Sequence, residues 1–97
     1  MNVVYQLRGT EFEWDSNKAE SNIAKHSVTF EEAAEVFFDP LSVLGDASAN
    51  DEQRYCIIWY SLAPRLLLTV YVERGQRTRI ISARLATKAE RRLYENP

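Results

Sequence analysis

The sequence predicts an α+β domain of two layers, in which α-helices pack on one face of an antiparallel β meander. Segments with strand character follow one another closely between residues 54 and 83, and so short a spacing permits only antiparallel pairing. Two T-x-x-E motifs, each typical of a helix start, begin at Thr29 and Thr87. The chain has 97 residues, 45% of them hydrophobic and 27% charged, which suits a single domain over residues 1–97.

The N-terminal residues predict a strand followed by a helix. Met1 to Thr10 alternate only weakly, so we expect either an N-terminal extension or an extra edge strand there. Residues Glu11 to Trp14 alternate with the period of a short strand. Asp15 follows as an N-cap candidate, and the first helix is expected from Ser16 to Lys25.

The second helix begins at the first T-x-x-E motif, Thr29 to Glu32. Its apolar residues recur at helical spacings and form one face: Phe30, Ala33, Ala34 and Phe37. Pro40 ends it, because the residue before a proline is pushed out of the helical region. A short strand at Leu41–Leu44 and a mobile polar loop at 45–52 are expected next.

The C-terminal half predicts the meander and a last helix. The three expected strands are Arg54–Tyr60, Leu66–Glu73 and Arg77–Ala83. Gly75 supplies the positive φ that the tight turn between the last two needs. The second T-x-x-E motif opens a helix from Lys88 to Tyr94. The predicted order is β-α-α-β-β-β-α, and we expect the helices to bury apolar residues that include Phe37, Ile58, Leu68 and Val70.

Composition excludes several classes of protein. Cys56 is the single cysteine, so no internal disulfide can form, and with the single His26 it leaves too few ligands for a structural zinc site. No apolar run approaches the roughly 20 residues that cross a bilayer, and no basic-then-apolar leader opens the chain. We expect a soluble cytoplasmic protein without a cofactor or a membrane partner.

The two halves of the chain carry opposite charge. Residues 1–52 hold three cations against eleven carboxylates, a net charge of −8, and residues 53–97 hold nine against three, a net charge of +6. Eight of those nine cations are arginines, whose planar fork suits phosphate or carboxylate. A polyanion or an acidic partner fits this pattern, as does mutual neutralisation of the two halves within one fold.

Three groups of residues carry a resemblance to a known family. The first is Phe12-Glu13-Trp14-Asp15, Lys18, Asn22, Lys25-His26, Val28-Thr29-Phe30-Glu31-Glu32-Ala33, Val36-Phe37 and Asp39-Pro40-Leu41. The second is Arg54-Tyr55, Arg65-Leu66-Leu67 and Glu73-Arg74-Gly75. The third is Arg79-Ile80-Ile81-Ser82-Ala83-Arg84, Ala86-Thr87, Glu90-Arg91-Arg92 and Tyr94. In this order and spacing they resemble the BrnT toxins of bacterial type II toxin–antitoxin pairs, with departures at Ser27, where the family usually has glycine, and in the bulkier stretch Ile58-Trp59-Tyr60.

The resemblance implies a RelE-like fold and a ribonuclease that arrests growth when it is not bound by its antitoxin. It implies cleavage without a metal, in which the ribose 2′-OH attacks the adjacent phosphate. The implied partners are the RNA substrate and a DNA-binding, BrnA-like antitoxin, with operator DNA contacted only through that antitoxin. The alternative is a module of the same fold that binds nucleic acid or protein without catalysis, because fold alone does not establish chemistry.

The chemistry needs a proton acceptor, a proton donor and cations aimed at the phosphorane oxygens. Histidine is the natural acid or base near neutrality, and His26 with Lys25 ends the first predicted helix, where the dipole favours imidazolium. The alternative for His26 is a C-cap that bonds the last carbonyls. Arg54 and Arg79 are the further catalytic candidates, as phosphate ligands.

Three more residues are candidates for binding. Arg84 either contacts the substrate or forms an ion pair with Glu90. Arg74 flanks the Gly75 turn and is otherwise a solvated charge, and Tyr94 either stacks on a base or packs the last helix. Arg79 and Arg84 occupy odd and even strand positions, so they point to opposite faces unless a bulge or the strand end intervenes.

Overall fold

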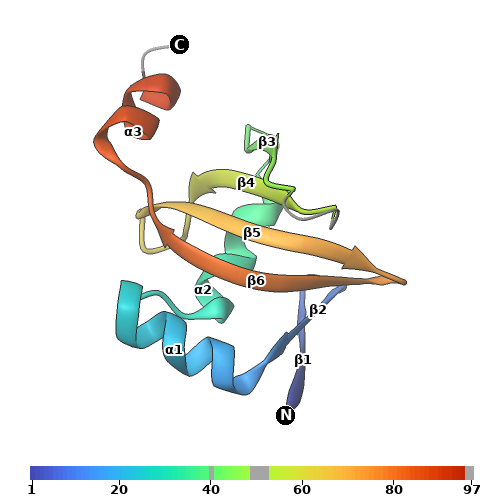
Figure 1. The fold of residues 1–97 in the computed structure, drawn as a ribbon. Helices are drawn as coiled ribbons and strands as arrows, with labels where there is room; N and C mark the ends of the chain where they lie inside the picture. Colours follow the sequence, from blue (N-terminus) through green and yellow to red (C-terminus); the bar gives the residue numbers. More distant parts are fainter. Residues whose placement is uncertain (40, 49–52, 96–97) are drawn as a thin grey trace.

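The computed structural model describes residues 1–39, 41–48 and 53–95, which form a mixed α+β fold (Figure 1). Along the chain the elements are β1 (Asn2–Leu7), β2 (Thr10–Asp15), α1 (Ser16–His26), α2 (Phe30–Glu35), a 3-10 turn η1 (Val36–Phe38), β3 (Val43–Asp46), β4 (Tyr55–Tyr60), β5 (Leu66–Arg74), β6 (Arg77–Leu85) and α3 (Lys88–Glu95). Within the described ranges, the strands form one six-stranded sheet in the order β1-β2-β6-β5-β4-β3.

The N-terminal residues form the extra edge strand. β1 pairs antiparallel with β2, and the hairpin turns at Arg8 and Gly9, both with positive φ. β2 then joins β6 in parallel, with Phe12 opposite Thr78 and Glu13 opposite Arg79. This parallel pairing was not predicted, because it joins residues more than 60 positions apart and no local pattern reports it.

The predicted helix starts are confirmed. The Asp15 carboxylate accepts a hydrogen bond from the Lys18 backbone N–H at 3.1 Å, and the Thr29 hydroxyl accepts one from the Glu32 N–H at 3.0 Å. The second helix is shorter than a continuous run to residue 37, because α2 ends at Glu35 and continues as the tighter η1. Pro40, its predicted terminator, lies outside the described residues.

The meander is confirmed, with β4, β5 and β6 paired antiparallel and Gly75 at φ 64° in the last turn. The short strand before it was placed too early. β3 begins at Val43 and includes Gly45 and Asp46, which were assigned to the loop. Gly45 lies opposite Cys56, and a Cβ on it would come within 2.8 Å of the Cys56 Sγ, so glycine permits the close pairing here. Residues 49–52 of the predicted loop lie outside the described ranges.

The prediction that all helices cover one face of the sheet was wrong. Figure 1 shows α1 and α2 on one side and α3 on the other. Fully buried side chains fill the α1–α2 side, among them Phe12, Phe30, Val28, Leu67 and Ile80. In the register of β4 and β5, Ile58, Leu68 and Val70 alternate with residues of that core and so face the α3 side. Ile58 is buried there, but Leu68 and Val70 are only partly buried. Phe37 is also partly buried, and it packs against the core on the α1–α2 side.

Candidate functional site

A bulge in β6 decides which arginines share a face. Successive residues of β5 lie opposite Ser82 and Ile80, so Ile81 is an extra residue on β6. Because of this extra residue, Arg79 and Arg84 both lie on the face turned away from α1 and α2. The bulge that the sequence allowed for is therefore present, and both arginines flank Ser82.

Arg79 is held by two partners from the N-terminal strands. Its Nη1 donates to the Glu13 carboxylate and, at 2.7 Å, to the Asn2 Oδ1. Glu13 is only 6% exposed, so its charge needs this cation. The Arg79 guanidinium thus ties β1, β2 and β6 together.

Arg84 forms the ion pair with Glu90 that the sequence suggested as one of its two roles. Its two terminal nitrogens donate to the two carboxylate oxygens of Glu90 at 2.8 and 3.0 Å. Glu90 also accepts from the Thr87 N–H at 2.8 Å, while its own N–H donates to the Thr87 hydroxyl at 3.2 Å, which completes the capping box. These bonds attach α3 to the end of β6.

The ion pair predicts how α3 responds to acid. The hydrogen bond from Arg84 lowers the pKa of Glu90 from its ordinary 4.5 to about 2. A depressed pKa in the folded state gives stability above pH 4.5 that is lost as the pH falls toward 2. Because the pair is partly exposed, we expect a loss of about 1 kcal/mol or less. Unfolding free energies at several pH values in that window, compared with those of Glu90→Gln, measure it. The difference between the two proteins should shrink as the pH falls, and a constant difference would contradict the assignment.

A buried asparagine fixes α1 against the edge of β6 beyond the β2 pairing. Asn22 is 5% exposed, and its Nδ2 donates to the Ala83 carbonyl at 2.8 Å and the Val28 carbonyl at 2.9 Å. Its Oδ1 accepts from the Ala83 N–H at 3.1 Å. Asn22 therefore occupies the hydrogen-bonding edge of β6 as a neighbouring strand would.

Between α1 and the bulge of β6 lies a hollow of about 190 Å³. Its lining residues are Lys18, Ser21, Asn22, Lys25, His26, Ile81 and Ser82. Lys18 lies four residues before Asn22 on α1, and Lys25 and His26 lie three and four residues after it. At these helical spacings the three side chains share one face of the helix with Asn22. Two lysines, a histidine, two serines and no acidic residue make this lining suited to a phosphate group.

The turn between α1 and α2 sets the end of this hollow. His26 ends α1, and Ser27 follows with φ 57°, a left-handed conformation that favours glycine. The Ser27 N–H donates to the Ile23 carbonyl at 2.9 Å, which closes the helix. Among the described residues the His26 side chain makes no hydrogen bond, so the capping role considered for it is not seen.

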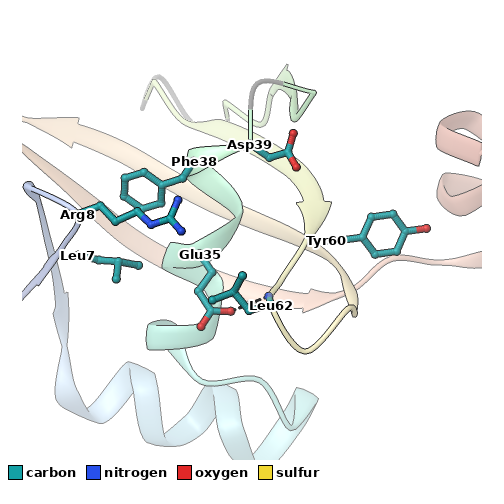
Figure 2. A pocket seen from close by; sticks show the side chains of 7 residues that line it. All are labelled: Leu7, Arg8, Glu35, Phe38, Asp39, Tyr60 and Leu62. Atoms are coloured by element: carbon teal, nitrogen blue, oxygen red, sulfur yellow. Dashed lines mark hydrogen bonds between the residues drawn. The ribbon is translucent and has the colours of Figure 1, made fainter.

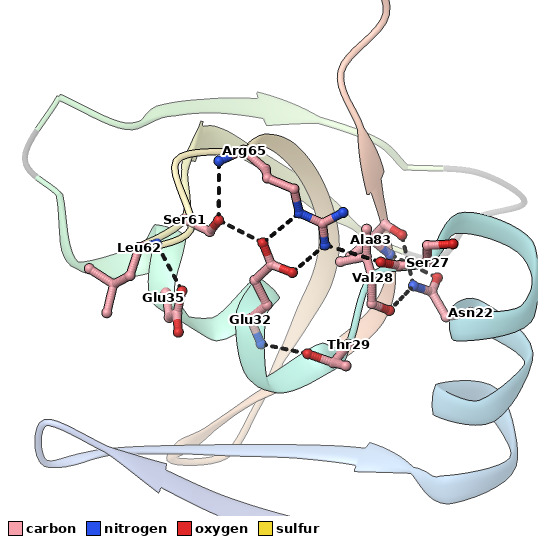
Figure 3. A network of polar contacts seen from close by, with 10 residues as sticks. All are labelled: Asn22, Ser27, Val28, Thr29, Glu32, Glu35, Ser61, Leu62, Arg65 and Ala83. Atoms are coloured by element: carbon pink, nitrogen blue, oxygen red, sulfur yellow. Dashed lines mark hydrogen bonds and ion pairs between the residues drawn. The ribbon is translucent and has the colours of Figure 1, made fainter.

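Arg65 and Glu32 hold the same turn from the other side (Figure 3). The Arg65 guanidinium donates twice to the Glu32 carboxylate and once, at 3.0 Å, to the Ser27 carbonyl. The Ser61 hydroxyl donates to Glu32 at 2.6 Å. The hydrogen bond from Arg65 is the main cause that lowers the pKa of Glu32, so this carboxylate remains ionised.

The other predicted residues do not line the hollow. Arg54 precedes β4, two strands away from β6 in the sheet, or about 10 Å at the usual strand spacing. Arg74 is exposed at the β5–β6 hairpin. Tyr94 is partly buried on α3, where burial raises the pKa of its hydroxyl. The structure thus brings Lys25 and His26 together and leaves these three outside.

A second hollow, of about 140 Å³, lies between the β1–β2 turn and η1 (Figure 2). Its lining residues are Leu7, Arg8, Glu35, Phe38, Asp39, Tyr60 and Leu62. The Arg8 guanidinium stands over the Phe38 ring at 5.7 Å, and Glu35 accepts a hydrogen bond from the Leu62 N–H at 2.9 Å. Two carboxylates and mostly apolar walls do not suit a phosphate, so the candidate site is the hollow beside α1.

Lys18, Asn22 and Ser82 belong to the hollow but were not singled out for chemistry. The helical spacing from Lys18 through Asn22 to His26 is a signal that sequence alone contained. Ser82 had no such signal, because its place depends on the bulge. In the described part of the chain no cluster of three or more His, Cys, Asp or Glu is placed to hold a metal, and no helix is long and apolar enough to cross a membrane.

Comparison with known proteins found a family model and a solved structure that are similar to this chain. Residues 14–90 match the family model described as "Ribonuclease toxin, BrnT, of type II toxin-antitoxin system". The fold is similar to the crystal structure of the Brucella abortus ribonuclease toxin BrnT, with a TM-score of 0.62 and 22% sequence identity over 77% of this chain and 94% of that chain. A search among curated proteins gave no match.

Proposed function

The chain belongs to the BrnT family of ribonuclease toxins of type II toxin–antitoxin systems, and we propose that it cleaves RNA at the hollow between α1 and β6. The observation that supports this site most directly is its lining: Lys18, Lys25 and His26 gather beside Ile81 and Ser82 of the β6 bulge, with no carboxylate among the lining residues. A phosphodiester placed there meets cations and a titratable group together.

The proposed reaction needs no metal. The ribose 2′-oxygen bonds to the adjacent phosphorus as a base removes its proton, and the bond from phosphorus to the 5′-oxygen breaks as an acid protonates that oxygen. The products are a 2′,3′-cyclic phosphate and a 5′-hydroxyl. We assign the proton transfer to His26 and stabilisation of the phosphorane charge to Lys25, with Lys18 as a second cation.

The arginines take other parts in the proposal. Arg79 and Arg84 already bind carboxylates, so in this proposal they shape β6 on either side of Ser82 and leave the cleaved phosphate to the lysines. Arg54, Arg74 and Tyr94 lie away from the hollow, and we assign them contacts with flanking nucleotides.

Type II membership implies an antitoxin partner. We propose that this partner is a DNA-binding, BrnA-like protein that covers the basic site, and that the complex contacts operator DNA only through it. Charge supports an acidic covering segment, because the lining of the hollow holds Lys18 and Lys25 and no carboxylate.

Induction of the chain alone in a bacterial host tests the function. We expect growth arrest with decay of total RNA, and relief by the folded double variant His26→Ala with Lys25→Ala. Circular dichroism checks that the variant is folded. Normal growth and intact RNA with soluble wild-type protein would contradict ribonuclease activity, and unchanged toxicity of the folded double variant would contradict the site.

A further inference from the structure

The turn between α1 and α2 consists of three residues, and each is bound to the rest of the domain. The Ser27 carbonyl accepts from Arg65, and the Val28 carbonyl accepts from Asn22. The Thr29 hydroxyl caps α2. This turn directly joins His26, the last residue of α1, to Phe30, the first residue of α2. The bonds that hold the turn therefore also hold the end of α1 that carries the imidazole.

Arg65 lies outside both helices, and its side chain bonds to α2 and to the residue that follows α1. It begins the approach to β5, 38 residues after Ser27, and its guanidinium contacts both Glu32 on α2 and the Ser27 carbonyl after α1. The Ser61 hydroxyl bonds Glu32 and so orients the carboxylate toward Arg65. One planar side chain therefore bonds both to α2 and to the backbone that follows α1, and acts with Asn22 and Thr29 in holding the turn between them.

The Arg65 side chain is 32% exposed, and it lines neither hollow. Its guanidinium donates hydrogen bonds to the Glu32 carboxylate and to the Ser27 carbonyl, directly after His26. Because Val28 and Phe30 are fully buried, we expect loss of Arg65 to leave the packing of α2 in place and to loosen the backbone that directly follows α1.

We propose that Arg65 is a positioning residue for the proposed cleavage, acting on His26 through the Ser27 carbonyl. The expected effect on catalysis rests on the proposed function. The position of the imidazole can be measured whether or not the chain cleaves RNA. Lysine keeps the charge at this position and lacks the fork that reaches Glu32 and Ser27 at once.

Because His26 is the only histidine, its imidazole gives a single set of NMR signals that report on its surroundings. In full-length Arg65→Lys we expect these signals to shift or broaden, and their response to added inorganic phosphate to weaken. With RNA we expect kcat to fall about tenfold while KM changes less than threefold, since orientation contributes to the barrier more than to binding.

A matched control is Arg77→Lys, which alters another arginine–glutamate pair, with Nε 2.8 Å from Glu11 and with the arginine 40% exposed, at the start of β6 and outside the lining of the hollow. It should keep the wild-type imidazole signals and kcat. If Arg65→Lys fails to fold, Ser61→Ala is the milder variant, and a smaller change of the same kind is expected. Wild-type signals and kcat in a folded Arg65→Lys would overturn the inference.

The two proposals fail differently. If the wild-type chain does not cleave RNA, the proposed function fails. The positioning role then stands or falls on whether the imidazole signals move in Arg65→Lys and stay in Arg77→Lys.

Discussion

Replacing His26 by alanine is expected to reduce RNA cleavage by the purified chain about 10²–10⁴-fold, because a positioned acid or base contributes a factor of that size. His26 is exposed at the end of α1 and lines the hollow with Lys25. Initial rates on a mixed-sequence RNA, measured at equal concentrations of folded protein, give the ratio.

The same substitution should leave the fold intact. An exposed side chain outside the core usually changes the unfolding free energy by no more than about 0.5 kcal/mol. Lys25→Ala is expected to reduce the rate as well, whereas Lys88→Ala, which removes an exposed lysine on α3, serves as the matched control for loss of one positive charge. Equal rates for the wild type and a folded His26→Ala would remove His26 from the mechanism.

Replacing Asn22 by alanine is expected to lower the free energy of unfolding by about 3 kcal/mol, because buried polar groups left unsatisfied cost about 1–3 kcal/mol each. The Ala83 N–H and carbonyl and the Val28 carbonyl all lose a partner. Urea unfolding followed by tryptophan fluorescence measures the change.

Asn17→Ala is the matched control for Asn22→Ala, since Asn17 is an exposed asparagine on the same helix. It should change the unfolding free energy by about 0.5 kcal/mol or less. A cost for Asn22→Ala as small as that would show that the bonds to β6 contribute little. The hollow would then depend on packing alone.

Local patterns predicted the local features. The cap at Thr29 and the positive φ at Gly75 depend on residues within a few positions, and both are present. Even so, the Glu32 of the first T-x-x-E motif does not complete a capping box, because its carboxylate binds Arg65 from 33 residues away.

Features that depend on contacts between distant parts of the chain could not be predicted from the sequence. The site depends on the Ile81 bulge and on the bonds between Asn22 and Ala83, 61 residues apart. Neither follows from periodicity or propensity. Arg79 was predicted as a phosphate ligand, but its guanidinium contacts Glu13. That contact arises from the parallel pairing of β2 with β6, which no local pattern contained.

The most direct test of the central claim is to incubate the purified chain with RNA in the presence of EDTA and to identify the new ends. The account predicts 2′,3′-cyclic phosphates and 5′-hydroxyls, formed by the wild type and lost in folded His26→Ala. Cleavage that requires a divalent metal and leaves 3′-hydroxyl and 5′-phosphate ends would contradict the mechanism, and intact RNA would contradict the activity.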